Sequence, residues 1–213
     1  MAKYEGGFLG PYSGLLGDGV GASFRGANIV RRRPRKSKKQ PTELQLAQRI
    51  RFAKVMQFLT PANLVLSTYF GKQTGTKSRF NLATAYHLKE AVAYDGTEAS
   101  ILYDKCLFSK GALLPPQNLT AVVAPNAELQ LSWVSNPYGN AKVDDQLVVV
   151  VHETQLAGLF EVYYNAGLRQ DATATVVVPN FMLGNPVHVW AFMVSADKKL
   201  VSTSQYLGAF TVL

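Results

Sequence analysis

Nine positions near the start of the chain, from Arg31 to Lys39, carry seven basic side chains and suit the binding of a polyanion. They are Arg31, Arg32, Arg33, Arg35, Lys36, Lys38 and Lys39. Charges this dense repel one another unless anions or solvent screen them, and Pro34 prevents a regular helix through the run. If all seven met phosphates, the affinity would fall with salt with a log–log slope of roughly 5 to 6. We expect sequence-independent contacts to a nucleic-acid backbone, extended by Arg49 and Lys54.

Two other interpretations of this basic run stay open. It can be a solvated linker that keeps the protein in solution, or it can meet an acidic protein or membrane surface. The position of the run favours a partner, because it lies between an aromatic, glycine-rich segment and a helix with two apolar sides. DNA, RNA and an acidic protein are not distinguished by the sequence.

The residue types that usually carry catalysis are few and scattered. Histidines occur at positions 87, 152 and 188, on different expected elements, and none has a second ligand type at metal-binding spacing. Asp144 and Asp145 are adjacent, and neighbours in a strand point to opposite faces, so we interpret the pair as a solvated turn. The single cysteine, Cys106, is expected to be buried and inert. We therefore expect no enzyme, no catalytic residues, no cofactor and no metal site.

Charge is distributed unevenly along the 213 residues. Positions 1–80 hold 15 basic and 3 acidic side chains, whereas positions 81–213 hold 7 basic and 11 acidic ones. Such asymmetry suggests that the front part meets a polyanion. The start lacks the pattern of a secretory signal, and the longest uncharged run alternates like strands, so we expect a soluble protein with no membrane partner, made in the cytoplasm and then incorporated into a virion.

The first 26 residues contain eight of the 17 glycines, with Phe8, Tyr12 and Phe24 between them. Glycine permits close backbone approach, and aromatic rings provide anchors. We expect an extended arm or hairpin that packs on a neighbouring copy, with a strand near 22–32. With the basic run, this arm makes up a first region at 1–40.

Three helices are expected in a second region at 41–98. Thr42 and Gln45 make a capping-box start for a helix that ends near Leu59. Thr60 and Pro61 open a second helix that Gly71 ends. The third is capped at Ser78 and stopped by the turn at 95–96.

The first of these helices is apolar on two sides. Phe52, Val55, Met56 and Leu59 form one stripe, and Leu46, Ile50 and Ala53 form another. A helix of this kind packs against more than one element. We expect Phe52 and Met56 to contact a neighbouring subunit.

Short apolar runs at roughly ten-residue spacing follow in a third region, at 99–213. They are "SILYDKCLF", "LTAVVA", "ELQLSWV", "LVVVVHE", "LFEVYY", "TATVVV", "VHVWAFMV" and "YLGAFTV". Seven or eight such runs predict an antiparallel β-sandwich. The fold class is therefore α+β: an N-terminal extended arm and a helical segment, followed by an immunoglobulin-like sandwich.

From Leu119 to Leu213 the pattern resembles a fibronectin type III domain. Trp133 lies in an early strand, "TATVVVPN" resembles the fifth strand, and "VHVWAFMVSADKKLVSTSQYLGAF" resembles the last hairpin. The resemblance implies a core of that type at about 117–213. His188 stands where that family usually has a tyrosine.

The whole chain is also similar to a family of uncharacterised proteins from Bacteroidota genomes and their mobile elements. The likeness rests on "GGFLGPYSG", "RRRPRKSKKQPTELQLAQRIRFAKVMQFL" and "SQYLGAF". It implies no activity, only a layout of arm, basic segment, helices and sandwich, in a setting where phage and other self-assembling structural proteins occur.

Two functions follow as hypotheses. The first is a structural, self-assembling subunit of a nucleic-acid-containing particle such as a phage capsid, with no cofactor. The alternative is a protein- or glycan-binding module in which the front half is a basic anchor.

Overall fold

The computed structural model describes residues 2–3, 12–24, 26–35, 39–155 and 159–212. The chain divides into two compact units, Met1–Glu43 and Leu44–Leu213, which we call the arm and the body. No helix among the described residues has both the length and the apolar character needed to cross a bilayer.

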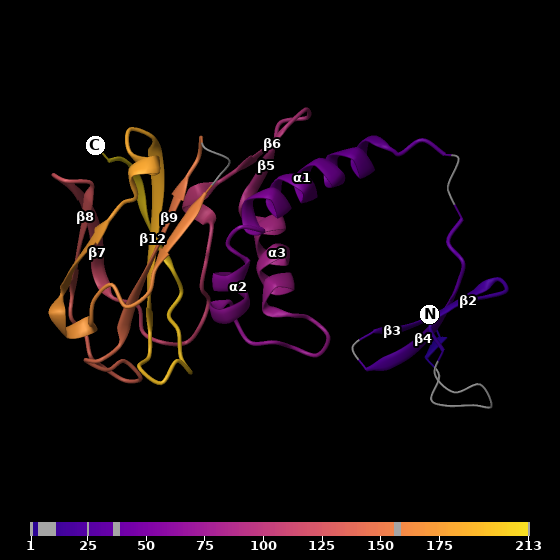
Figure 1. Cartoon of the computed structure of the whole chain (residues 1–213), viewed down its shortest axis with the longest axis horizontal. Coiled ribbons are helices and arrows are strands. Elements are labelled where there is room, and N and C mark those ends of the chain that lie inside the picture. The colour runs from indigo at the N-terminus through magenta and orange to yellow at the C-terminus, as the bar shows by residue number, and fades with distance from the viewer. Residues whose placement is uncertain (1, 4–11, 25, 36–38, 156–158, 213) are drawn as a thin grey trace. The chain divides into compact units, whose positions relative to one another are not determined.

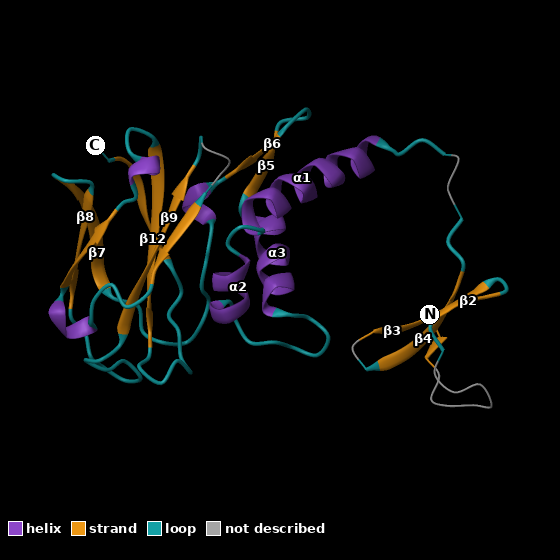
Figure 2. Cartoon of the chain, in the orientation of Figure 1, coloured by secondary structure: helices purple, strands orange, loops and turns teal. Residues whose placement is uncertain are grey.

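The body contains a β-sandwich whose described strands are all antiparallel (Figure 2). The smaller sheet has the order β11-β8-β7, and the larger has the order β10-β9-β12-β13. Their bounds are β7 Gln117–Ala124, β8 Glu128–Val134, β9 Gln146–Glu153, β10 Phe160–Tyr163, β11 Thr173–Val177, β12 Pro186–Val194 and β13 Gln205–Thr211. The predicted sandwich is confirmed.

Alternating side chains of the two sheets form the sandwich core. On β8 these are Leu129, Leu131 and Trp133. Across from them lie Leu147, Val149, Val151, Val187, Val189, Ala191 and Met193 of β9 and β12. Successive strand residues face opposite sides, so the intervening residues of β9 and β12 point away from this core.

Three helices of the described chain belong to the body: α1 Glu43–Leu59, which begins at the last residue of the arm, α2 Asn63–Tyr69 and α3 Arg79–Glu90. The start of α3 is as predicted, because the Ser78 hydroxyl accepts a hydrogen bond from the backbone N–H of Asn81, at 3.2 Å. At the end of α1, the Thr60 hydroxyl donates to the carbonyl of Met56. The predicted extent of α1 is confirmed, whereas α2 begins at Asn63 with Ala62 as its N-cap, later than Thr60 and Pro61 predict.

The helices cover the outer face of the larger sheet, so the body has three layers (Figure 1). Val148 and Val150 of β9, with Trp190, Phe192 and Val194 of β12, share a second core with the helices. The helices contribute the buried side chains Val55, Phe58, Leu59, Val65, Leu66 and Ala83. A sheet covered on both faces needs apolar residues at every position, which accounts for the continuous run "LVVVV".

The third helix is shorter than the sequence predicts. It ends at Glu90, and the chain continues as a hairpin of β5 Val92–Tyr94 and β6 Ala99–Ile101. The Asp95 carboxylate accepts hydrogen bonds from the N–H groups of Thr97 and Glu98, at 2.8 and 2.7 Å. The Asp95-Gly96 turn therefore closes a hairpin instead of ending a helix.

The expected strand "SILYDKCLF" is also mostly wrong. Only its first two residues lie in β6, and a 3-10 helix, η1, spans Tyr103–Lys105. Cys106 follows it and is buried as expected, and desolvation raises the pKa of its thiol. Two further 3-10 helices, η2 Arg169–Asp171 and η3 Asn180–Met182, lie in the loops of the sandwich.

The arm is a separate antiparallel sheet of order β1-β4-β3-β2. Its strands are β1 Ala2–Lys3, β2 Gly14–Leu16, β3 Gly19–Phe24 and β4 Ala27–Arg32. The single strand expected near 22–32 is thus the hairpin of β3 and β4.

A buried ion pair ties the loops at one end of the sandwich together. Asp145, expected in a solvated turn, is fully buried, and its Oδ2 lies 3.0 Å from Nε of Arg169. The same guanidinium donates to Oδ1 of Asn136 and to the carbonyl of Leu114. Asp144 is exposed, so the expectation holds for only one of the two carboxylates.

We predict that Asp145→Ala lowers the free energy of unfolding by about 3–5 kcal/mol, because it leaves a buried guanidinium without its counter-charge. Urea unfolding measures the loss. Asp144→Ala is the matched control and should stay within about 0.5 kcal/mol of the parent. If Asp145→Ala also lost no more than about 0.5 kcal/mol, the Asp145–Arg169 ion pair would not stabilise these loops.

Candidate nucleic-acid interface

Among the described residues, the sheet of the arm has no fully buried apolar core. None of its described apolar side chains is buried, and both core clusters consist of body residues. Leu15, Leu16 and Phe24 are 61%, 54% and 55% exposed. Small sheets normally need one apolar face packed against another layer to be stable in water.

One aromatic contact shapes the arm from within. A Cβ added at Gly21 would lie 2.5 Å from the ring of Tyr12, so the ring packs directly against the strand backbone. Tyr12, expected to be an assembly residue, is thus an anchor inside the arm, whereas the Phe24 side chain is 55% exposed. Phe8 lies outside the described residues.

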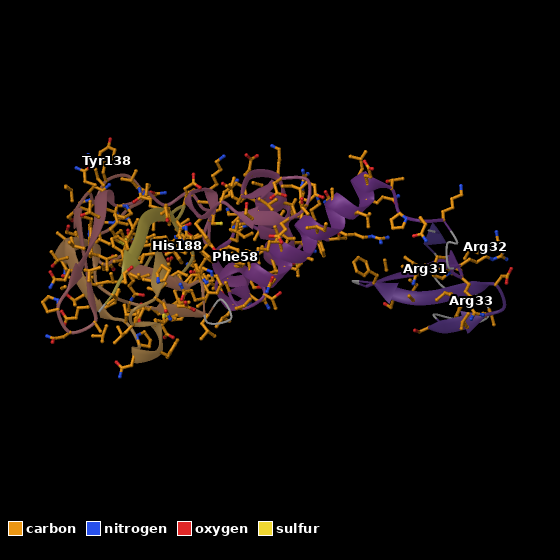
Figure 3. All side chains as sticks on the ribbon, turned by 90° about the horizontal axis from the view of Figure 1, so that it is seen from above. Arg31, Arg32, Arg33, Phe58, Tyr138 and His188 are labelled. Atoms are coloured by element: carbon orange, nitrogen blue, oxygen red, sulfur yellow. The ribbon has the colours of Figure 1, made fainter. Side chains whose placement is uncertain are left out.

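The basic run begins at the end of strand β4. Arg31 pairs with Val20 of β3, and Arg32 pairs with Gly19, so the two side chains leave opposite faces of the sheet. The N–H of Arg33 donates to the carbonyl of Asp18, at 2.8 Å. Figure 3 shows Arg31, Arg32 and Arg33 at this end of the arm.

The described arginines of the basic run have exposed side chains. Within the described part of the chain, Arg31, Arg32, Arg33 and Arg35 have no ion pair with a carboxylate. Lys39 is exposed as well, and Lys36 and Lys38 lie outside the described residues. Residues 1–43 hold nine basic and three acidic side chains, a net charge of +6.

The spacing of these charges suits a nucleic-acid backbone. An extended chain advances about 3.3 Å per residue, so four arginines in five positions give one cation per ~4 Å. A DNA strand carries one phosphate per ~3.4 Å of helix axis. The arm therefore approaches the charge density of a single strand.

The remaining predicted nucleic-acid contacts, Arg49 and Lys54, lie on α1 and are exposed. They are five positions apart, which puts them about 140° from each other around the helix. Arg51 is half-buried instead, with its guanidinium carbon 5.1 Å from the ring centre of Tyr94. Arg49, Arg51 and Lys54 therefore do not form one basic patch on α1.

Helix α1 is buried only near its end. Val55, Phe58 and Leu59 enter the core, whereas Phe52 is exposed and Met56 is half-buried. The second predicted stripe, Leu46, Ile50 and Ala53, is exposed, and we call it the outer face of α1. Ile50 and Ala53 line a groove of about 430 Å³ that Thr97, Glu98 and Ala99 of the β5–β6 hairpin complete.

Sequence reasoning missed a pair of histidines on the outer face of the larger sheet. His152 of β9 and His188 of β12 are directly opposed in register, so they share a face. The ring of His152 stacks on Phe160 at 4.2 Å, and that of His188 on Tyr103 at 3.9 Å. The sequence places the two histidines on different elements, and only strand register brings them side by side.

The histidines are held in the neutral form by their surroundings. Desolvation lowers the pKa of His152 to about 4, and it also lowers the pKa values of His188 and His87. Nδ1 of His188 lies 2.7 Å from the hydroxyl of Tyr206. Nε2 of His87 accepts from the N–H of Leu107, so its Nδ1 donates to the Ala83 carbonyl.

No three His, Cys, Asp or Glu side chains of the described residues gather closely enough to hold a metal ion.

Comparisons with known proteins identify a family but no activity. Residues 11–208 match the model of a family of unknown function, DUF6266. Among solved structures, the fn3 domain of the human collagen alpha-1(XX) chain is similar at 15% identity with a TM-score of 0.35. The match covers 47% of this chain and 86% of that one. No curated protein matches the chain.

We predict that the body loses stability as the pH falls from about 6.5 to about 4, with a contribution from His152 on the order of 2–3 kcal/mol. The unfolded chain takes up the proton near pH 6.5, whereas folded His152 resists it until about pH 4, so acid favours unfolding. Thermal unfolding across this pH window measures the slope.

The variant His152→Phe keeps an aromatic ring on Phe160 and removes the titrating group. It should flatten the slope in part, because His87 and His188 still titrate. An unchanged slope would show that His152 is not the acid-sensitive group.

Proposed function

We propose that this chain, which belongs to the family of unknown function DUF6266, is a non-enzymatic structural subunit that associates with copies of itself and contacts nucleic acid through its arm. The observation that carries the proposal is that the described sheet of the arm buries no apolar side chain. A sheet without a core gains its stability from a surface outside itself.

The partner that we infer for the apolar surfaces is a second copy of the chain. The arm exposes Leu15, Leu16 and Phe24, and α1 exposes its outer face, of which Ile50 and Ala53 line a groove of mixed polarity. Two exposed apolar surfaces on one chain allow each copy both to offer and to accept a contact. Such head-to-tail contacts produce rings or extended assemblies.

Nucleic acid is the inferred partner of the arginines. Their charges form no ion pair with a carboxylate of the described residues, and their spacing is close to that of phosphates along a nucleic-acid strand. Contacts to phosphates carry no sequence information, so binding is expected to be non-specific. Most specifically, we propose a virion-like particle. In it, copies assemble through their exposed apolar surfaces, and their arms neutralise packaged nucleic acid.

One observation favours a second candidate, a protein- or glycan-binding module. Tyr138 is 81% exposed on the sandwich and borders a groove with Pro115, Pro116 and Asn136 (Figure 3). Exposed tyrosine beside amide side chains is common on recognition surfaces. A sandwich that binds a partner through Tyr138 would do so without self-association.

We predict that changing Arg31, Arg32, Arg33 and Arg35 to Ala lowers the log–log salt slope for binding nucleic acid by about 3, because up to four phosphate contacts are lost. Fluorescence anisotropy with a labelled oligothymidylate of about twenty nucleotides measures it. The control replaces Lys77, Lys89, Lys105 and Lys142 with Ala and loses the same charge elsewhere. Equal slopes for the two variants would contradict the role of the arm.

We predict that Ile50→Glu weakens self-association at least tenfold, because it places a charge in the groove beside the outer face of α1. Sedimentation over a concentration series measures the equilibrium. Leu64→Glu on α2 is the matched control, since Leu64 is another exposed leucine-sized side chain. A parent chain that stays monomeric at all concentrations would remove the structural-subunit proposal.

A further inference from the structure

A second basic site lies within the body, remote in sequence from the basic run. A cavity of about 420 Å³ opens between the end of α2, the start of α3, the segment 110–112 and the β12–β13 connection. Its volume lies within the usual range for small-molecule sites. Tyr69, Ala112, Leu200 and Val201 provide apolar parts of its wall.

Five cationic side chains line this cavity: Lys72, Arg79, Lys110, Lys198 and Lys199. None of the lining residues is acidic. The nearby carboxylate of Asp197 lies 3.5 Å from the ammonium of Lys199, and both groups are largely exposed. Four cations are thus left without a carboxylate partner among the lining residues.

The cations come from segments that the backbone holds together. The N–H of Gly71 donates to the carbonyl of Lys110 at 2.8 Å, and the N–H of Lys110 donates to the carbonyl of Tyr69. On the other side, the N–H of Leu113 donates to the carbonyl of Val201 at 3.0 Å. Three walls of the cavity, namely the end of α2, the segment 110–113 and the β12–β13 connection, therefore form one hydrogen-bonded framework.

Gly111 lets these walls meet closely. A Cβ at this position would lie 2.1 Å from the carbonyl oxygen of Val201, so no other residue fits without moving the β12–β13 connection. Two of the cationic side chains are held by further contacts. The Arg79 guanidinium donates a hydrogen bond to the carbonyl of Thr68, and the Lys110 ammonium lies 5.4 Å from the ring centre of Tyr86. Like charges are thus held around one space.

We propose that this cavity binds a ligand that carries phosphate groups. Several cations around one site suit a polyvalent anion with many acceptor oxygens, and a single carboxylate would leave most of them unbalanced. The ligand is a free phosphate compound or a phosphodiester of nucleic acid, which present the same chemistry. The site belongs to the body and does not depend on the arm.

The test uses pyrophosphate and isothermal titration calorimetry on the full chain. The cavity variant changes Lys72, Lys110 and Lys199 to Met, which takes one charge from each wall and keeps the aliphatic stems. The control variant changes Lys89, Lys105 and Lys142 to Met, which removes the same charge from exposed positions outside the cavity. We expect saturable binding that the cavity variant weakens at least tenfold and the control variant leaves within about twofold.

Two further measurements separate the sources of phosphate and keep this site apart from the arm. The variant with Ala at Arg31, Arg32, Arg33 and Arg35 should bind pyrophosphate with the affinity of the parent. This result would support the cavity site whether or not the arm binds nucleic acid. If that variant still binds oligothymidylate, and the cavity substitutions abolish this residual binding, the ligand of the cavity is a phosphodiester of nucleic acid. If the cavity binds pyrophosphate but not oligothymidylate, its ligand is a free phosphate compound. No saturable binding of pyrophosphate, or equal affinity in the cavity and control variants, would overturn the proposal.

Discussion

A β-sheet persists in water only when it can bury an apolar face, and the two units of this chain meet that constraint in opposite ways. In the body, the sheet of β9 and β12 is covered on both faces, by the smaller sheet and by the helices. Every residue from Leu147 to Glu153 is therefore buried. In the arm, a sheet of similar strand number has no fully buried apolar side chain among the described residues. The body has the means to fold alone, whereas we propose that the arm gains stability from a partner.

This contrast links packing to function. The large apolar faces of the body are occupied, so its free surfaces are local: the outer face of α1, the groove at Tyr138 and the cationic cavity. The arm instead combines apolar exposure with arginines that have no ion pair among the described residues. We infer that the arm is stabilised when its apolar side chains meet another copy and its charges meet phosphates.

Local patterns predicted much of the fold because they report local physics. Ser78 caps α3 as its side chain suggests, and the alternation in "ELQLSWV" gives the buried face of β8. The residues that the sequence could not place depend on distant neighbours. Asp145 is buried because Arg169 reaches it from 24 residues away, and His152 meets His188 through strand register. In the candidate interface, the basic residues were found by composition, but the missing core of the arm and the cavity around Lys110 appear only in three dimensions.

Hydrogen exchange of the arm would show whether its sheet is stable only when a partner is bound. Amides of β3 and β4 should be protected at concentrations where the chain associates, or with nucleic acid bound, and should exchange at nearly unprotected rates in dilute protein. Amides of β9 and β12 should stay protected throughout, because their sheet has its own core. Strong protection of β3 and β4 in a dilute, isolated monomer would contradict the account.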